Sequence, residues 1–524
     1  MKKIFRLIFG RLFWVALILL IEIAALVGAI AFGVLFVSTA NSWIVFLIIG
    51  LIWLLTVIIS LVIINSKANT SYKNLWLATI AILPFIGLTL YLFFGNKSTT
   101  KRMSRKIEPI RKATESIEFP QDALDELSKN DEYKFAHNIS SYLVKDSMTH
   151  CYKDTETTYF SLGDDAFPVI LEELRKAKHY IFLEYFIIAN GVMWNSILSI
   201  LKEKASKGVD VRVMYDDVGS IGTVKYSYPK YLESLGIKCV AFNRFKPLVN
   251  VKLNNRDHRK ILVIDGYVGF TGGINFADEY INRVVRFGHW LDNAIMLKGK
   301  SVYNLTILFL STWCTIYNSA KELSLDKYQY DKFLPEGVKF KSDGFVHPYG
   351  DLPFDDLSVG ESVYLNLIYQ AKKTLYITTP YLIIDDQLEH ALCGAASRGV
   401  DVKLLVPHIP DKKIVFNITR SYYKHLIECG IKIYEYTPGF VHEKIFIVDD
   451  NKATVGTINL DYRSLCLHME NGVFLFKCSC IQEMKRSFLE SISKSELIDL
   501  KRYKELSRHK RIFWSLLRLF APLL

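Results

Sequence analysis

Cysteine spacings typical of metal or disulfide modules are missing from this chain. Its eight cysteines among 524 residues form no C-x-x-C pair and no closely spaced set. Structural zinc modules and disulfide-stapled secreted domains depend on such spacings, so the sequence favours neither class. Cys478-x-Cys480 is interpreted as two buried or edge-strand thiols. We therefore expect no metal ion, no disulfide framework and a reducing compartment.

Charge is almost absent from three long apolar stretches near the amino terminus, within which Glu22 is the sole charged residue. The stretches are Leu12 to Val37, Trp43 to Ile64 and Leu75 to Phe94. Each approaches the roughly 20 residues needed to cross a bilayer. The first is too long for a signal peptide and lacks a small-residue cleavage site. Residues 1–98 are therefore predicted to be a membrane anchor with two or three transmembrane segments.

Basic residues flank this anchor at both ends. Four precede the first stretch, and a denser cluster lies between Lys97 and Lys112. Cytoplasmic flanks are enriched in Lys and Arg, and three full spans cannot place both flanks inside. Either the first stretch inserts against its weaker signal or one stretch is re-entrant. We expect a multi-pass protein of the cell membrane, with residues 99–150 as a basic connector and the large domain in the cytoplasm.

The net charge of +12 indicates an anionic partner. For an anchored protein this partner is more simply the anionic headgroups of membrane lipids than nucleic acid, and no nucleic acid is expected. Residues 501–524 mix basic and apolar side chains, and Arg508 to Leu524 has the composition of a helix in the membrane interface. A packed carboxy-terminal helix explains the same composition nearly as well.

One unusual motif occurs twice with identical internal spacing. It is His258-x-Lys260-x4-Asp265-x6-Gly272-x2-Asn275 and His442-x-Lys444-x4-Asp449-x6-Gly456-x2-Asn459. Side chains alternate along a strand, so a histidine and a lysine two residues apart project from one face. Imidazole, ammonium and the amides of Asn275 and Asn459 together suit a phosphodiester. The two copies predict one composite site built by two similar halves.

Two aspartates of the motif have a structural alternative, because Asp265 and Asp449 follow an apolar run and a carboxylate there can cap a strand-end turn. Beyond each motif, Asp292-Asn-Ala and Glu470-Asn-Gly form another matched pair. A carboxylate there would accept the Nδ1 proton of an imidazole, fixing its tautomer and raising its basicity. Asp292 and Glu470 are therefore predicted to orient the imidazoles.

The sequence around the motifs repeats as well, which indicates duplication. Ala205-Ser-Lys-Gly-Val-Asp-Val-Arg212 matches Ala396-Ser-Arg-Gly-Val-Asp-Val-Lys403 without a gap. Apolar strands alternate with helical stretches, the pattern of an α/β fold. Residues 151–345 and 346–500 are predicted to be two halves of one pseudo-twofold composite domain, with transmembrane helices before it.

The duplicated H-x-K-x4-D pattern resembles the phospholipase D superfamily. Glu184-Tyr-Phe-Ile, Tyr215-Asp-Asp, Thr379-Pro-Tyr381 and the segments after each motif are similar to bacterial cardiolipin synthases, as is Leu83 to Gly95. The resemblance implies two phospholipase D-like repeats and the transfer of a phosphatidyl group between two phosphatidylglycerol molecules, giving cardiolipin and glycerol without a metal or cofactor. It also implies that Asp265 and Asp449 belong to the active site. Gly273, Thr457 and His468 depart from the family pattern.

Two-step chemistry follows from this resemblance. One imidazole attacks phosphorus and forms a phosphohistidine, while the other protonates the leaving glycerol and then deprotonates the incoming hydroxyl. The superfamily's usual order makes His258 the nucleophile and His442 the acid and base, although the pseudosymmetry leaves the reverse open. A membrane-anchored phospholipase D, a tethered nuclease and a catalytically silent scaffold are the alternatives.

Overall fold

The computed structural model describes residues 28, 42–66, 69–95, 98–115, 117, 119–244, 255–317, 325–329, 332–334, 337–354, 357–505, 507–518 and 521. The chain forms two compact units, Met1–Ser98 and Thr99–Leu524. The predicted first transmembrane stretch, Leu12 to Val37, lies outside the described residues apart from Gly28.

In the first unit, α3 spans Ser42–Ile64. Its segment Phe46–Ile64 is the one helical segment among the described residues that is long and apolar enough to cross a membrane. The stretch Leu75 to Phe94, predicted as one span, is instead divided between α4 (Thr70–Ile82), α5 (Pro84–Leu90) and the π-helical turn η1 (Tyr91–Gly95). Proline disfavours the helical conformation in the residue before it, and Leu83 has φ −131°. The hydropathy pattern therefore predicted one continuous segment, whereas the chain bends at Leu83.

The second unit contains two mixed sheets. The strand order of the first is β1-β9-β7-β6-β2-β3-β4, in which β2, β3 and β4 are parallel. Its strands are β1 (Thr155–Phe160), β2 (Tyr180–Tyr185), β3 (Asp210–Asp216), β4 (Lys238–Phe242), β6 (Lys260–Ile264), β7 (Val268–Gly272) and β9 (Ala294–Gly299). The connecting helices are α9 (Gly163–Lys176), α10 (Val192–Ser206), α11 (Tyr228–Ser234) and α12 (Val302–Tyr317).

The second sheet repeats this order as β10-β17-β16-β15-β11-β12-β13, with β18 added at the edge. Its strands are β10 (Phe345–Asp351), β11 (Thr374–Thr378), β12 (Asp401–Pro407), β13 (Lys432–Tyr436), β15 (Ile445–Val448), β16 (Lys452–Gly456), β17 (His468–Phe476) and β18 (Ser495–Ile498). Its helices are α13 (Val359–Gln370), α14 (Asp386–Ser397), α15 (Lys413–Glu428), α16 (Tyr462–Cys466) and α17 (Cys480–Ser493). The matching order confirms the predicted α/β fold of two similar repeats.

The two repeats share one apolar core and two short strand pairs. Side chains of β6 and β9 from the first repeat and of β15, β16 and β17 from the second lie in a single buried cluster that also includes α12. In addition, β5 (Arg256–Asp257) runs parallel to β17, and β14 (Gly439–Val441) runs parallel to β8 (His289–Leu291). Each short pair joins a strand of one repeat to a strand of the other.

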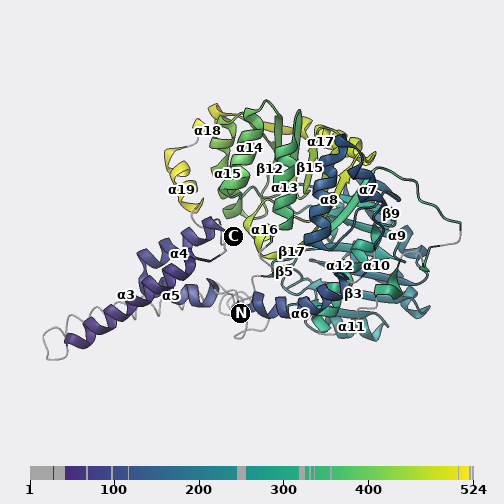
Figure 1. Ribbon diagram of the computed structural model, residues 1–524, viewed down its shortest axis with the longest axis horizontal. Helices are drawn as coiled ribbons and strands as arrows, with labels where there is room; N and C mark the ends of the chain where they lie inside the picture. Colours follow the sequence, from purple (N-terminus) through teal and green to yellow (C-terminus); the bar gives the residue numbers. More distant parts are fainter. Residues whose placement is uncertain are drawn as a thin grey trace. The chain divides into compact units, whose positions relative to one another are not determined.

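Helices before and after the repeats also belong to the second unit. They are α6 (Ser98–Glu115), α7 (Asp122–Ser128), α8 (Lys134–Ser147), α18 (Leu500–Glu505) and α19 (Arg508–Arg518). Ile139 and Leu143 of α8 are fully buried in the core of the second repeat, so this region packs as part of the domain. Figure 1 shows α19, in yellow, beside α15, and its Trp514 is only 5% exposed. Helix α19 therefore packs against the second repeat.

One disulfide joins Cys393 on α14 to Cys429 at the end of α15, with 5.3 Å between the Cα atoms. One disulfide between distant cysteines is not the compact framework that the sequence argued against, but the sequence did not predict this pair. Thirty-six residues separate the two cysteines, and the fold of the second repeat brings them together. The other six cysteines take no part in a disulfide among the described residues.

Candidate active site

Backbone pairing places each motif histidine opposite a carboxylate of the other repeat. In the β5–β17 pair, Asp257 faces Met469, so the next residues, His258 and Glu470, face one another. The backbone N–H of His258 donates to the carbonyl of Met469 at 2.9 Å. In the β14–β8 pair, Val441 faces Leu291. His442 follows Val441 and Asp292 follows Leu291, so His442 and Asp292 also face one another. The register of two short parallel pairs thus builds the site.

The carboxylates bind the imidazoles across the repeats. His258 Nδ1 lies 2.9 Å from one oxygen of Glu470 and 3.0 Å from the other. His442 Nδ1 lies 2.6 Å from Asp292. Both carboxylates are completely buried, and both histidine residues are at most 7% exposed. Because Nδ1 of each ring is occupied, Nε2 is the ring atom that remains for chemistry.

The two lysines are held beside these histidines. Lys260 Nζ donates to the carbonyl of His258 at 2.6 Å, and Lys444 Nζ donates to the carbonyl of His442. Burial lowers the pKa of Lys260 to about 7 and that of Lys444 to about 8, although Glu470 and Asp292 oppose the change. The surroundings of the lysines therefore lack enough negative charge to keep both ammonium groups fully charged as the pH rises above neutral.

Burial dominates the acid–base state of the imidazoles too. It lowers the pKa of His442 to about 4, despite the opposing effect of Asp292. It also lowers the pKa of His258 well below its ordinary value, against the carboxylate of Glu470. Burial would raise the pKa of Glu470, but the neighbouring His258 holds it well below its usual range. Both imidazoles are neutral in the unliganded protein near neutral pH.

The two carboxylates differ in their other partners. Glu470 accepts hydrogen bonds from the hydroxyls of Thr457 and Ser464. Asp292 accepts one from the backbone N–H of Asn293 at 2.9 Å. Gly273 occupies the position equivalent to Thr457, and a Cβ there would stand 1.9 Å from Oδ1 of Asp292. The absence of a side chain at Gly273 therefore leaves space for the carboxylate itself.

The motif aspartates lie at the far ends of their strands. Asp265 accepts hydrogen bonds from three successive backbone N–H groups that lead into β2, those of Lys178, His179 and Tyr180. Asp449 does the same for Lys372, Lys373 and Thr374 at the start of β11. Five residues of strand separate Asp265 from Lys260, or about 16 Å. The structure does not bring these carboxylates to the imidazoles, and their contacts support the turn-capping interpretation.

The two motif asparagines differ in whether their amide oxygens already have hydrogen-bond partners. Asn275 accepts from the backbone N–H of Ile187 and donates to the hydroxyl of Tyr280. Asn459 has a buried Oδ1 without a hydrogen-bond partner among the described residues. One N–H of Asn275 is thus already committed within the protein, whereas Asn459 has an amide oxygen that nothing satisfies.

Sequence reasoning assigned no role to several buried groups around the site. His468, at the start of β17, lies 3.7 Å from Glu470, with its ring centroid 5.5 Å from that of His258. Glu443 is completely buried, and burial together with the nearby Asp292 raises its pKa to about 8. The signal for Glu443 was its position between His442 and Lys444, where a charged side chain must be neutralised or paired.

A metal ion would compete with existing bonds at this site. His258, His468 and Glu470 have potential ligand atoms close together. However, Nδ1 of His258 and both oxygens of Glu470 are already joined by hydrogen bonds. The arrangement instead offers two oriented imidazoles and two lysines, a set suited to covalent transfer at an anionic phosphodiester.

Fold and site together define a duplicated phosphodiester-transfer domain. Residues 170–304 and 364–492 match the family model described as "Cardiolipin synthase, PLD-like domain", and residues 45–96 match "Phospholipase_D-nuclease N-terminal". The chain belongs to this cardiolipin synthase family of phospholipase D-like proteins. Helix α3 and the N-terminal match indicate that it associates with a membrane.

Individual relatives support this membership. A cardiolipin synthase of Alkalihalophilus pseudofirmus is 34% identical over 95% of this chain and 98% of its own length. An uncharacterized protein of Streptococcus mutans is 42% identical over 88% of this chain and 99% of its own length. The crystal structure of a phosphatidylserine synthase of Haemophilus influenzae superposes with a TM-score of 0.53 at 16% identity, covering 75% of this chain and 98% of that one. That likeness concerns the fold alone.

Proposed function

We propose that this protein is a cardiolipin synthase that transfers a phosphatidyl group from one phosphatidylglycerol to the terminal hydroxyl of another, releasing glycerol. The crossed imidazole–carboxylate pairs carry the proposal, because they equip two histidines of one site for covalent and acid–base work. Curated relatives of nearly full length bear this activity in their names.

His258 is the proposed nucleophile. Its Nε2 attacks phosphorus, the bond from phosphorus to the headgroup glycerol breaks, and the Nε2–H of His442 protonates the departing oxygen. His442 then removes the proton from the hydroxyl of the second lipid. That oxygen attacks phosphorus and releases His258. Every proton given by His442 in the first step is recovered in the second.

The surroundings of the carboxylates favour this assignment over its reverse. Glu470 already accepts from two hydroxyls, which spread its negative charge and reduce its support for a protonated His258. Asp292 has no hydroxyl partner among the described residues and binds His442 at 2.6 Å. A proton is therefore retained more readily on His442, as its role as general acid requires.

Lys260, Lys444, Asn275 and Asn459 are proposed to hold the nonbridging phosphate oxygens. Two buried ammonium groups supply the charge that a metal ion supplies in other phosphoryl-transfer sites. Asp265 and Asp449 are proposed to act at a distance, by fixing the strands that carry the lysines. The reaction then needs neither a metal nor a cofactor.

Nucleic acid is the less suitable substrate. Single-stranded chains are held by aromatic side chains exposed for stacking, and the aromatic residues considered for this role are Tyr185, Phe186, Tyr381 and Phe440. Tyr185 is 3% exposed and stacks on Phe276, while Phe440 is 1% exposed. These two rings are core residues. Phe186 and Tyr381 are half-buried, but Phe186 lies edge-on to the imidazole of His258 and the Tyr381 hydroxyl donates to Asp411. Anionic lipids, which a protein of net charge +12 attracts, are the proposed partners.

We further propose a multi-pass arrangement in the cell membrane with the second unit in the cytoplasm. The basic residues that follow the anchor support this orientation. The anchor is assigned to residues 1–98, the connecting helices to 99–150, the halves to 151–345 and 346–500, and the C-terminal segment to 501–524. Protease protection of the second unit in inverted and right-side-out vesicles tests the orientation.

The activity is tested with the full chain in nonionic detergent, phosphatidylglycerol and a chelator. Mass spectrometry should find cardiolipin and glycerol in equal amounts. His258→Ala should abolish both, and His442→Ala should abolish turnover while leaving a slowly formed phosphohistidine at His258. Phosphatidic acid as the sole lipid product would identify a hydrolase instead. Full turnover by either variant would contradict the composite site.

A further inference from the structure

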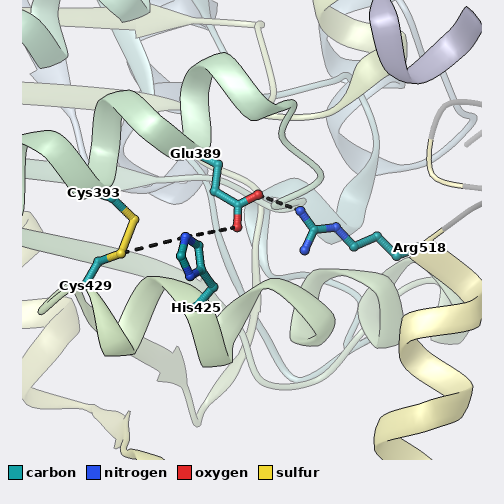
Figure 2. The surroundings of a disulfide bond; sticks show 5 residues. All are labelled: Glu389, Cys393, His425, Cys429 and Arg518. Atoms are coloured by element: carbon teal, nitrogen blue, oxygen red, sulfur yellow. Dashed lines mark hydrogen bonds and ion pairs between the residues drawn. A yellow bond between two sulfur atoms is a disulfide. The ribbon is translucent and has the colours of Figure 1, made fainter. Parts of the chain in front are cut away.

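Four potential metal ligands meet on the outer helices of the second repeat, apart from the phosphodiester site. Glu389 and Cys393 are four residues apart on α14, and His425 and Cys429 are four residues apart at the end of α15. Side chains at this spacing lie one turn apart on the same helix face. Two adjacent helices therefore each present a pair of ligands toward the other, as Figure 2 shows.

Distances within the cluster are those of groups that share a ligand-sized space. Nε2 of His425 lies 3.9 Å from Sγ of Cys429 and 4.0 Å from an oxygen of Glu389. The sulfur atoms and the imidazole nitrogen all lie within 4.8 Å of one another. Zinc–sulfur and zinc–nitrogen bonds of about 2.0–2.3 Å separate neighbouring ligands in a tetrahedron by about 3.3–3.8 Å. The two sulfurs, which are bonded to each other in the disulfide, would have to separate to about this distance after reduction, while the imidazole and the carboxylate shift only slightly.

We propose that Cys393, Cys429, His425 and Glu389 bind one zinc ion when the two cysteines are reduced. Thiolate and imidazole ligands in a tetrahedral set select Zn²⁺ among the common divalent ions. Because His425 is exposed and Cys429 is partly exposed, an ion can reach the site from solvent. The site has no part in phosphatidyl transfer, so it stands or falls independently of the proposed activity.

Arg518 of α19 completes the charge balance. Two thiolates, one carboxylate, one neutral imidazole and Zn²⁺ have a net charge of −1, and the guanidinium contributes +1. Arg518 binds the oxygen of Glu389 that faces away from His425, at 2.5 Å, and stacks on the ring of Tyr422. A hydrogen bond of this kind orients a metal-ligating carboxylate. The zinc site would thereby fasten the C-terminal helix to the repeat.

The disulfide is the oxidised form of the same pair. A dithiol reductant attacks the Cys393–Cys429 bond, gains the sulfur–sulfur bond in its own product, and leaves two thiols in the protein. Zinc binding then displaces one proton from each thiol, without further electron transfer. Zinc and the disulfide therefore exclude one another, and the reduced protein is the metal-binding form.

The proposal is tested by measuring zinc in the full chain, purified in detergent with a phosphine reductant. A thiol assay first verifies that all eight cysteines are free. We expect about one zinc per chain, and cobalt in its place should give the near-ultraviolet absorption of a cobalt–thiolate bond. Cys393→Ser and Cys429→Ser should each remove both signals. Cys466→Ser, which changes a partly exposed cysteine outside the cluster, should remove neither.

Three further variants examine the remaining ligands, one of them as a control. His425→Ala should weaken zinc binding by at least tenfold, whereas His390→Ala, an exposed histidine of α14, should not change it. Arg518→Gln should weaken binding by about 10- to 100-fold, because it frees the carboxylate of Glu389. Less than one-tenth of a zinc per chain in the fully reduced protein would overturn the proposal. So would zinc content that Cys393→Ser leaves unchanged, which would identify an adventitious ion.

Discussion

Replacing Glu470 by glutamine separates the charge of the carboxylate from its shape. Glu470 is completely buried, binds His258 Nδ1 through both oxygens and accepts from Thr457 and Ser464. A glutamine of the same size keeps one acceptor oxygen but places an N–H₂ group where the second oxygen was. At least one of the three partners then faces a donor instead of an acceptor, and the imidazole loses its anion.

The substitution raises the activation barrier of the step in which the imidazole of His258 becomes cationic. As Nε2 of His258 bonds to phosphorus, positive charge develops on the ring and is stabilised through Nδ1–H by the Glu470 carboxylate. Loss of a charge-assisted hydrogen bond in a buried site costs about 2–4 kcal/mol. At about 1.4 kcal/mol per factor of ten, kcat should fall by about 30- to 1,000-fold. KM should change far less, because the carboxylate does not touch the substrate.

The assay is the initial rate of cardiolipin formation in nonionic micelles at pH 6.5. Glu443→Gln is the matched control, because the pKa of Glu443 near 8 means that this buried carboxyl is already neutral at that pH. It should retain kcat within a few-fold. A Glu470→Gln enzyme whose kcat stays within threefold of the unaltered protein would refute the imidazole-orienting role.

Three further outcomes follow from the contacts of the site. Asp265→Asn should lower the free energy of unfolding by about 1–3 kcal/mol, measured by denaturation in detergent, while kcat per folded molecule changes little; a large loss of kcat alone would instead indicate a chemical role. Burial lowers the pKa of Lys260 to about 7 and that of Lys444 to about 8, so both ammonium groups lose charge as the pH rises. The value of kcat/KM in neutral micelles should therefore fall through pH 7–8. A flat profile up to pH 9 would contradict this expectation. Gly273→Ser should reduce transfer at least tenfold by displacing Asp292, whereas an unchanged rate would show that the carboxylate has room to move.

The duplicated spacing was sufficient to predict the histidines and lysines that meet in the site. It placed each histidine and lysine on one strand, whereas His258 and His442 lie just before β6 and β15, outside any strand. It was also sufficient to propose Asp292 and Glu470 as partners of the imidazoles. The spacing could not predict that each carboxylate binds the imidazole of the other repeat. Pairing within one repeat and pairing between repeats satisfy the same sequence pattern, and the choice depends on the register of β5 on β17 and of β14 on β8.

Other features depended on local backbone geometry or on distant contacts. Asp265 and Asp449 have φ near +50°, a conformation that aspartate tolerates at turns, and this turns each carboxylate toward three amides of another strand. The hydropathy of Leu75 to Phe94 averages over Pro84 and so conceals the bend before it. The Cys393–Cys429 contact depends on how α14 and α15 pack against each other. The residues next to each cysteine in the sequence do not predict this packing.

The low pKa of His442 explains how one site prepares a base and an acid from two similar imidazoles. In the unliganded protein burial leaves both rings neutral and lowers the pKa of both lysines, because desolvation outweighs the two carboxylates. A phosphodiester adds one negative charge among these four groups, and an added anion raises the pKa of every nearby base. In the proposed mechanism, the ring that takes up a proton is the one whose carboxylate has fewer competing donors, which is His442. Under this proposal, substrate binding itself supplies the general acid, and the acid forms when there is a leaving group to protonate.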